Sequence, residues 1–238
     1  MKGKFKLNHL IVHLILLVGV IVVVFPFAWM ILTSFKTSGE AMKIPPTIFP
    51  EKFVTTAYHT IVTSAIPFAT VYMNTIITTV VTTLVQIVFC SMAGYAFGRI
   101  EFPFKNAIFI LVLSVLMVPG QIFMSLPKEL EEAAIVDGCG RFRIFAQIML
   151  PLIKPGIVAM SIFTIKFAWN DFMWPLIVNT SMNKMTLGPA LSTLQGQYTT
   201  EYPMQMAGAV LAVLPLVVMF FIFQKQFIEG VAQSGIKG

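Results

Sequence analysis

The sequence predicts an all-α, polytopic transmembrane protein, and three observations carry that prediction. The 238 residues are 57% hydrophobic and only 11% charged, with a mean hydropathy of +0.86, whereas a soluble domain is about 25% charged. The apolar residues gather in runs long enough to cross lipid as helices. The net charge of +6 comes from basic residues that flank these runs, which is typical of a membrane protein and not of a surface that binds nucleic acid.

Five apolar runs have the length and composition of transmembrane helices. The first follows Lys2, Lys4 and Lys6 and has no small-residue cleavage site, so we expect an uncleaved helix with its N-terminus in the cytoplasm. Pro26 is expected to kink it. The predicted spans are about 10–32, 71–97, 107–123, 155–176 and 206–223.

The second run is rich in hydroxyl and amide side chains. Threonines suit close packing between helices in lipid, and they stand at positions 75, 78, 79, 82 and 83. Asn74 and Gln86 lie in the same run. We interpret these two amides as groups that bridge helices rather than contact a substrate.

A polar segment, predicted at 125–154, lies between two apolar runs. It must sit in water beside the membrane, because lipid does not accept so many charges. Its spacing predicts two short helices, with Gly138 and Gly140 at the break and Phe142, Phe145 and Met149 forming the apolar face of the second helix. The charged residues are Lys128, Glu129, Glu131, Glu132, Asp137, Arg141, Arg143 and Lys154.

This segment contains a spaced motif: Glu132-Ala133-Ala134, three residues, Gly138, nine residues, then Ile148 and Leu150-Pro151. The motif resembles the cytoplasmic coupling loop of the membrane-spanning subunits of bacterial ATP-binding-cassette importers. The resemblance extends to Trp169-Asn170-Asp171 and to the tail at 235–238. Together these features look like those of the carbohydrate-uptake permeases, in the branch related to the smaller maltose-type subunit.

The resemblance implies a fold, a function and a set of partners. The expected fold is a type I importer permease core, which normally has six helices, of which about five are present here. The expected function is to import sugars, with oligosaccharides the expected class, across the bacterial cell membrane, with both termini in the cytoplasm. The expected partners are a second, different permease, two ATPase subunits and an extracytoplasmic sugar-binding protein.

The resemblance also assigns roles within the motif. Glu132 would pair with a basic group on the ATPase, Ala133 and Ala134 would allow close packing, and Gly138 would make the turn. Leu150-Pro151 would direct the chain back to the membrane, with Asp137 and Ile148 in the same segment. Gly235 and Lys237 of the tail would reach the ATPase dimer.

No phosphate-binding loop is present in this chain. The segment 230–237 has glycines and Lys237, but no Ser or Thr follows the lysine and no strand precedes it, so it cannot cradle phosphates. We therefore predict no catalytic residue, no metal ligand and no cofactor of its own, with ATP and Mg bound by the partner subunits.

The fourth run carries ionisable and amide side chains, which are costly in lipid and usually face a cavity or a partner. Lys166 and Asn170 share a helix face, and the group completed by Trp169, Asp171 and Trp174 could line a translocation path. The same polar groups could instead pair between helices, and the sequence leaves both interpretations open. The polar segment 178–204 resembles the outer loop that meets the sugar-binding protein.

The charge pattern and the number of spans conflict. Five crossings place the ends of the chain on opposite sides, yet both ends and the 125–154 segment are basic. We therefore predict that one crossing is missing, and that an internal segment is absent between about Gln121 and Met124. A re-entrant hairpin at Pro119-Gly120 is the alternative. An ion-coupled secondary transporter and a non-functional, internally deleted permease are the competing functions.

Overall fold

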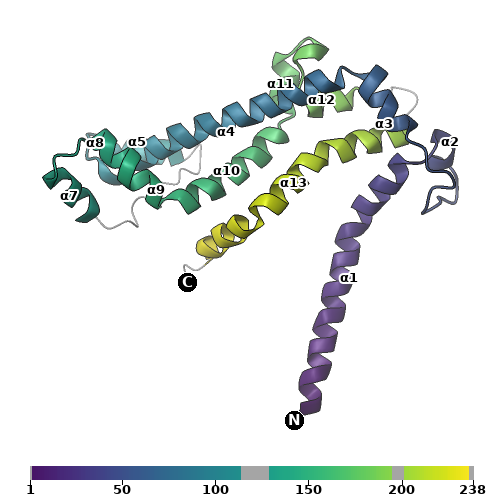
Figure 1. Ribbon diagram of the computed structural model, residues 1–238, viewed down its shortest axis with the longest axis horizontal. Helices are drawn as coiled ribbons and strands as arrows, with labels where there is room; N and C mark the ends of the chain where they lie inside the picture. The colour runs from purple at the N-terminus through teal and green to yellow at the C-terminus, as the bar shows by residue number, and fades with distance from the viewer. Residues whose placement is uncertain (1, 114–128, 195–200, 236–238) are drawn as a thin grey trace. The chain divides into compact units, whose positions relative to one another are not determined.

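The structure, a computed structural model, consists of helices and connecting segments throughout the residues it describes, which are 2–113, 129–194 and 201–235 (Figure 1). This confirms the predicted all-α class. The elements in chain order are α1 (Lys2–Ser34), α2 (Ser38–Ala41), α3 (Thr56–Thr60), η1 (Ile61–Ala65), α4 (Phe68–Arg99), α5 (Lys105–Leu113), α7 (Glu129–Val136), α8 (Arg141–Ile144), η2 (Phe145–Met149), α9 (Leu150–Leu152), α10 (Lys154–Trp169), α11 (Met173–Val178), η3 (Met182–Lys184), α12 (Leu187–Ser192) and α13 (Tyr202–Gly235).

The chain divides into two compact units. The first comprises Met1–Asn74 and Phe172–Val217, and the second comprises Thr75–Asp171 and Val218–Gly238. The first unit has a core of Ala57, Ile61 and Ala207. The second has a core that joins the end of α4 to the segment after α7, and it is described with the candidate site.

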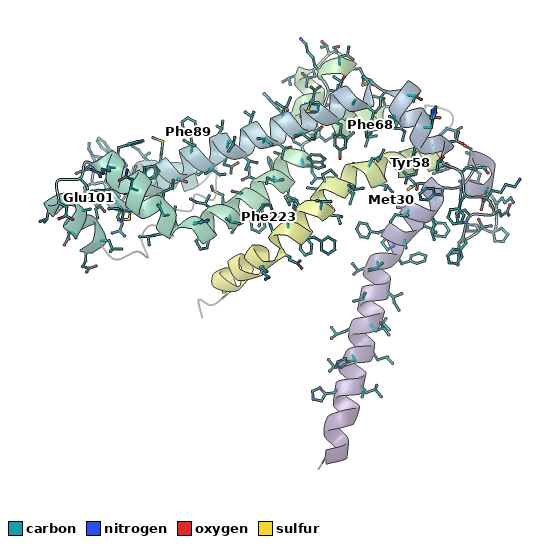
Figure 2. The ribbon with its side chains drawn as sticks, in the orientation of Figure 1. Met30, Tyr58, Phe68, Phe89, Glu101 and Phe223 are labelled. Atoms are coloured by element: carbon teal, nitrogen blue, oxygen red, sulfur yellow. The ribbon has the colours of Figure 1, made fainter. Side chains whose placement is uncertain are left out.

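Three of the described helices are long and apolar enough to cross a membrane: His9–Ser34, Phe68–Arg99 and Tyr202–Lys225. They cover three of the predicted spans. From Leu10 to Phe27 the apolar side chains of α1 are exposed and project from the helix (Figure 2), as expected where lipid or another membrane helix is the neighbour. Proline lies inside α1 at Pro26 and inside α13 at Pro215.

The threonines of α4 sort by helical spacing. Thr75, Thr79 and Thr83, four residues apart, are buried, whereas Thr78 is exposed. The hydroxyl of Thr83 donates to the Thr79 carbonyl at 2.7 Å, so a hydroxyl on this buried face is satisfied within its own helix. One face of α4 is thus used for packing within the chain.

The predicted span 155–176 is interrupted in the structure. Helix α10 ends at Trp169 and a new helix, α11, begins at Met173. Pro175 explains the break, because its ring would collide with the carbonyl of Asp171 and it has no N–H to donate to that carbonyl. The intervening Asn170 and Asp171 favour such breaks, since their side chains compete for backbone hydrogen bonds.

The third predicted span, 107–123, is described only in its first half, as α5. The remainder, and the predicted missing crossing between about Gln121 and Met124, lie outside the described residues. Residues Arg141–Leu152 and Lys154–Trp169 together have the length and apolar composition of a span but are bent by 78°. The bend therefore separates the second half of the 125–154 segment from α10.

Candidate functional site

Helix α7 ends in a turn that only glycine adopts easily. Gly138 has φ +78°, and its N–H donates to the Ile135 carbonyl at 3.0 Å while the Cys139 N–H donates to the Ala134 carbonyl at 2.9 Å. This pair of bonds is the Schellman motif, which closes a helix with a left-handed residue. Gly140, with φ −70° and ψ 154°, has an extended backbone that any residue adopts.

The two alanines of the motif face different surroundings. Ala134 is buried in the second unit's core, whereas Ala133 is exposed. Glu132 and Asp137 are also exposed. The outward side of α7 therefore carries Glu132, Ala133 and Asp137, while Ala134 is occupied with packing inside this chain.

Tyr95 and Glu131 connect α4 to α7. The Tyr95 hydroxyl donates to Glu131 Oε1 at 3.0 Å, and the Tyr95 ring contacts Phe145, with centroids 5.4 Å apart. Tyr95 is 5% exposed. The sequence shows Glu131 and Glu132 as neighbours of the same type, but about 100° of helix rotation separates them, and only Glu131 faces α4.

The predicted apolar face of the second helix is partly wrong. Phe142 is 75% exposed, while the buried residues are Ile144, Met149 and Ile153. The cause is η2, a π-helical stretch from Phe145 to Met149, because its i→i+5 geometry widens the turn. Positions 144 and 149 therefore share a face that ordinary α-helical spacing assigns to 142, 145 and 149.

The end of the motif lies partly in this core. Ile148 and Leu150 are half-buried and pack against the cluster of Tyr95, Ala134, Ile144, Met149 and Ile153. Pro151 is exposed and stands in the first turn of α9, where its missing N–H costs no helical hydrogen bond. In the predicted tail, Gly235 is the last residue of α13 and Lys237 lies outside the described residues.

The predicted path residues fall on α10, on α11 and on the break between these helices. Lys166 and Asn170 are exposed, and the Asn170 side-chain amide donates to the Lys166 carbonyl at 2.8 Å. Phe163 and Phe167 are exposed at 56% and 74%, so α10 presents aromatic and polar groups on one face. The sequence reasoning missed Phe167, although its spacing from Phe163 and Asn170 was a sufficient signal.

The remaining members of that predicted group lie elsewhere. Trp169 and Asp171 are half-buried. Trp174 is exposed but belongs to α11, in the other unit. Among the described residues, no three His, Cys, Asp or Glu side chains come together in a group that could hold a metal ion.

Asn74, predicted to bridge helices, contacts the short 3₁₀ helix η3 and the residue that follows it. Its side-chain amide donates to the carbonyls of Asn183, at 2.8 Å, and Met185, at 3.0 Å. Both carbonyls belong to the segment 178–204 that the sequence singled out. The residue thus ties α4 to the connection between α11 and α12.

A charged network closes the connection between α1 and α3. The Glu40 carboxylate is buried and accepts from the Glu51 N–H at 2.8 Å and the Thr47 hydroxyl at 2.9 Å. Lys36 is also buried, donates to the Thr47 carbonyl and lies 4.7 Å from the Trp29 ring centre. Burial raises the pKa of Glu40, but these hydrogen bonds, with the charges of Lys36 and Lys43, outweigh it and lower the pKa overall.

Comparison with known proteins adds an independent result. Residues 6–233 match the model of the family described as "Binding-protein-dependent transport system inner membrane component". The arabinooligosaccharides transport system permease protein AraQ of Halalkalibacterium halodurans is 33% identical, over 91% of this chain and 92% of that protein. The Bacillus subtilis protein of the same name is 30% identical, over 99% of this chain and 98% of that protein.

A solved structure resembles the fold at low sequence identity. It is a bacterial ABC transporter involved in the import of the acidic polysaccharide alginate, and the matched chain has a TM-score of 0.82 with 17% identity, covering 94% of this chain and 98% of that one. That likeness concerns the fold alone. With the family match over nearly the whole chain, it leads to one conclusion: the chain belongs to the family of binding-protein-dependent transport system inner membrane components, and is a multi-pass permease of the bacterial membrane and a transport subunit rather than an enzyme.

Proposed function

We propose that this chain is one permease subunit of an ATP-driven importer of oligosaccharides, and that the segment from α7 to α9 docks on a separate ATPase subunit. The complex would contain a second, different permease, two ATPase subunits and an extracytoplasmic sugar-binding protein. The observation that carries the proposal is the outward side of α7, where Glu132, Ala133 and Asp137 are exposed while Ala134 holds the helix to its own chain.

The surroundings of this surface suit a protein partner. Leu130, Ile135, Val136 and Phe142 are exposed at 40%, 54%, 87% and 75%. Apolar side chains clustered beside charged ones on a water-facing surface are typical of interaction sites. The exposed carboxylates of Glu132 and Asp137 would meet basic groups on the ATPase, and Ala133 would allow its backbone to approach closely.

The substrate class rests on relatives and on α10. Relatives are named as transport proteins for arabinooligosaccharides, starch degradation products (Thermoanaerobacterium thermosulfurigenes, 26% identical) and diacetylchitobiose (Streptomyces coelicolor, 27% identical). The exposed face of α10 offers the faces of Phe163 and Phe167 with the polar groups of Lys166 and Asn170. Aromatic faces beside hydrogen-bonding groups suit sugar rings, and this face would line the path.

The path assignment has its own test. Phe167→Ala and Asn170→Ala should each raise the KM for uptake of arabinotriose or maltotriose, whichever the cells import. Phe89→Ala is a matched control, since Phe89 is exposed on α4 (Figure 2) and outside the proposed path. A KM that moves no more in the α10 variants than in the control would exclude α10 from the path.

The ion-coupled alternative is disfavoured, because the family works with a binding protein and the coupling motif would have no role in it. The other alternative, a non-functional and internally deleted permease, is tested by the same experiment as the proposed docking of α7. The chain is tagged in its own bacterium and purified with whatever ATPase accompanies it, and MgATP hydrolysis is measured.

We expect wild type to carry the ATPase, and Glu132→Lys to lose most of it while remaining in the membrane. Glu101→Lys is the control, because Glu101 is an exposed acid that forms an ion pair with Lys105, four residues away, at 2.9 Å. Chain purified free of other subunits should show no hydrolysis. If Glu132→Lys recovers as much ATPase as wild type does, α7 is not the docking element. If wild type recovers no ATPase, the chain is better explained as a non-functional permease.

A further inference from the structure

We infer that Tyr95 and Glu131 form a strut that sets the position of α7 relative to α4, and that this strut is required for coupling. The inference rests on the proposed docking of α7 to an ATPase. It assigns Tyr95, which lies well outside the motif, and Glu131, the acid next to the motif's Glu132, to the coupling machinery as positioning residues.

The strut is built from a polar and an apolar contact on one residue. The Tyr95 hydroxyl donates to the Glu131 carboxylate at 3.0 Å, and its ring lies against Phe145 of η2 with centroids 5.4 Å apart. The first contact reaches α7 and the second reaches the segment that follows it. One side chain near the end of α4 therefore contacts both α7 and η2.

Few side chains of α7 are buried against the described part of the chain. Ala134 is the one buried residue of this helix, while Ala133, Ile135 and Val136 are exposed. An alanine contributes little contact area, so the direction in which α7 points depends strongly on the hydrogen bond at Glu131. Such a bond to an ionised acceptor is stronger and more directional than one between neutral groups.

Through this arrangement, a movement of α4 would change the position of the exposed side of α7. Glu131 and Glu132 are adjacent in α7, so the residue that faces α4 and the residue that faces outward share one short rigid helix. A displacement of the end of α4 is passed through Tyr95 to Glu131 and thus to the exposed side of α7. Loss of the hydroxyl would leave α7 attached but free to change its angle.

The test measures position and activity separately. Cys90 and Cys139 are first replaced by serine. Spin labels are then attached at Met92→Cys on α4 and Val136→Cys on α7, both exposed positions, and the distance between the two labels is measured. Tyr95→Phe should broaden the distance distribution and lower MgATP hydrolysis by the purified complex about tenfold, with normal recovery of the ATPase. Glu131→Ala should do the same, and the double variant should be no worse than either single variant.

Two controls separate positioning from general damage. Glu131→Gln keeps an acceptor oxygen for the hydroxyl and should restore most of the activity lost in Glu131→Ala. Tyr58→Phe also removes a hydrogen-bonded tyrosine hydroxyl, which lies 2.7 Å from Ser34 Oγ in the other unit. It should change neither the distance distribution nor the rate of MgATP hydrolysis.

Unchanged distances in Tyr95→Phe would overturn the strut, and broadened distances with wild-type hydrolysis would overturn its role in coupling. If wild type recruits no ATPase, the proposed function fails, while the distances still decide whether the strut exists.

Discussion

The side chain of Asn74, on α4, donates hydrogen bonds to the backbone carbonyl of Asn183, at 2.8 Å, and to that of Met185, at 3.0 Å. An amide can donate to two carbonyls at once, whereas an ionised carboxylate only accepts. Asn74 is therefore a specific anchor for the segment around η3, and the residue type matters more than its size.

Asn74→Asp should loosen this segment more than Asn74→Ala, because the carboxylate would both lose the two bonds and repel the two carbonyls. The loss is expected to be about 1–3 kcal/mol. Cleavage by trypsin after Lys184, followed in membranes by mass spectrometry, should accelerate about tenfold. Asn179→Asp, the same change within the segment, serves as the control, and cleavage of both Asn74 variants at the wild-type rate would argue against an anchor that works by donation.

The Glu40 network predicts sensitivity to acid. Its hydrogen bonds and neighbouring charges hold the pKa of Glu40 below its ordinary value of 4.5, so the native state stabilises the ionised form. The stabilising contribution is complete above pH 4.5 and is lost as the pH falls through the lowered pKa.

Hydrogen exchange at the Glu51 amide, which donates to Glu40, is the appropriate measurement. After correction for the intrinsic rate, exchange should accelerate below pH 4.5. In Glu40→Gln, whose amide oxygen can still accept from the Glu51 N–H but which does not ionise, the acid step should be much smaller. A wild-type acid step retained in Glu40→Gln would assign the sensitivity to another group.

The two glycines after α7 should respond differently to alanine. Gly138 has φ +78° and Gly140 has φ −70°, and an added Cβ meets no atom within 4 Å at either position. Backbone strain is therefore the main difference, and a left-handed alanine costs about 1–2 kcal/mol. Gly138→Ala should lower the thermal stability of the detergent-solubilised chain and Gly140→Ala should not; equal effects would show that φ is not the cause.

The predicted missing crossing remains a prediction, and one alignment supports it. The match to the Bacillus subtilis permease protein YurM runs over 281 positions and covers all of this 238-residue chain, so at least 43 aligned positions have no residue here. A crossing helix needs about 20 residues, so the unmatched positions are enough for the crossing that we predict between about Gln121 and Met124.

Cysteines introduced as Lys4→Cys, Arg141→Cys and Lys237→Cys decide the topology through labelling with a membrane-impermeant maleimide. We expect the 238-residue chain to show at least one of the three on the opposite side from the others, because five crossings are an odd number. Labelling of all three from the cytoplasm would show instead that residues 107–123 enter and leave on one side.

Some features of the fold could be predicted because they depend only on residues that are neighbours in the sequence. Apolar runs without charge specified helices because lipid leaves no other way to satisfy the backbone, and α1, α4 and α13 cover three of the predicted spans. Gly138 was identified as a turn because few other residues adopt a positive φ. The break before α11 was equally local in cause, and the sequence reasoning overlooked Pro175 rather than lacking it.

Other features depended on contacts between distant parts of the chain. The choice of Glu131 over Glu132 for the inward side, the exposure of Phe142 and the anchoring by Asn74 each follow from which surface meets a helix face. Adjacent residues of one type differ only in their rotation about the helix axis, and a π-turn shifts that rotation for every residue after it. The sequence by itself therefore determined the membrane class, the motif and its turn. Tertiary packing decided which of two neighbouring side chains, such as Glu131 and Glu132, faces the core and which stays exposed.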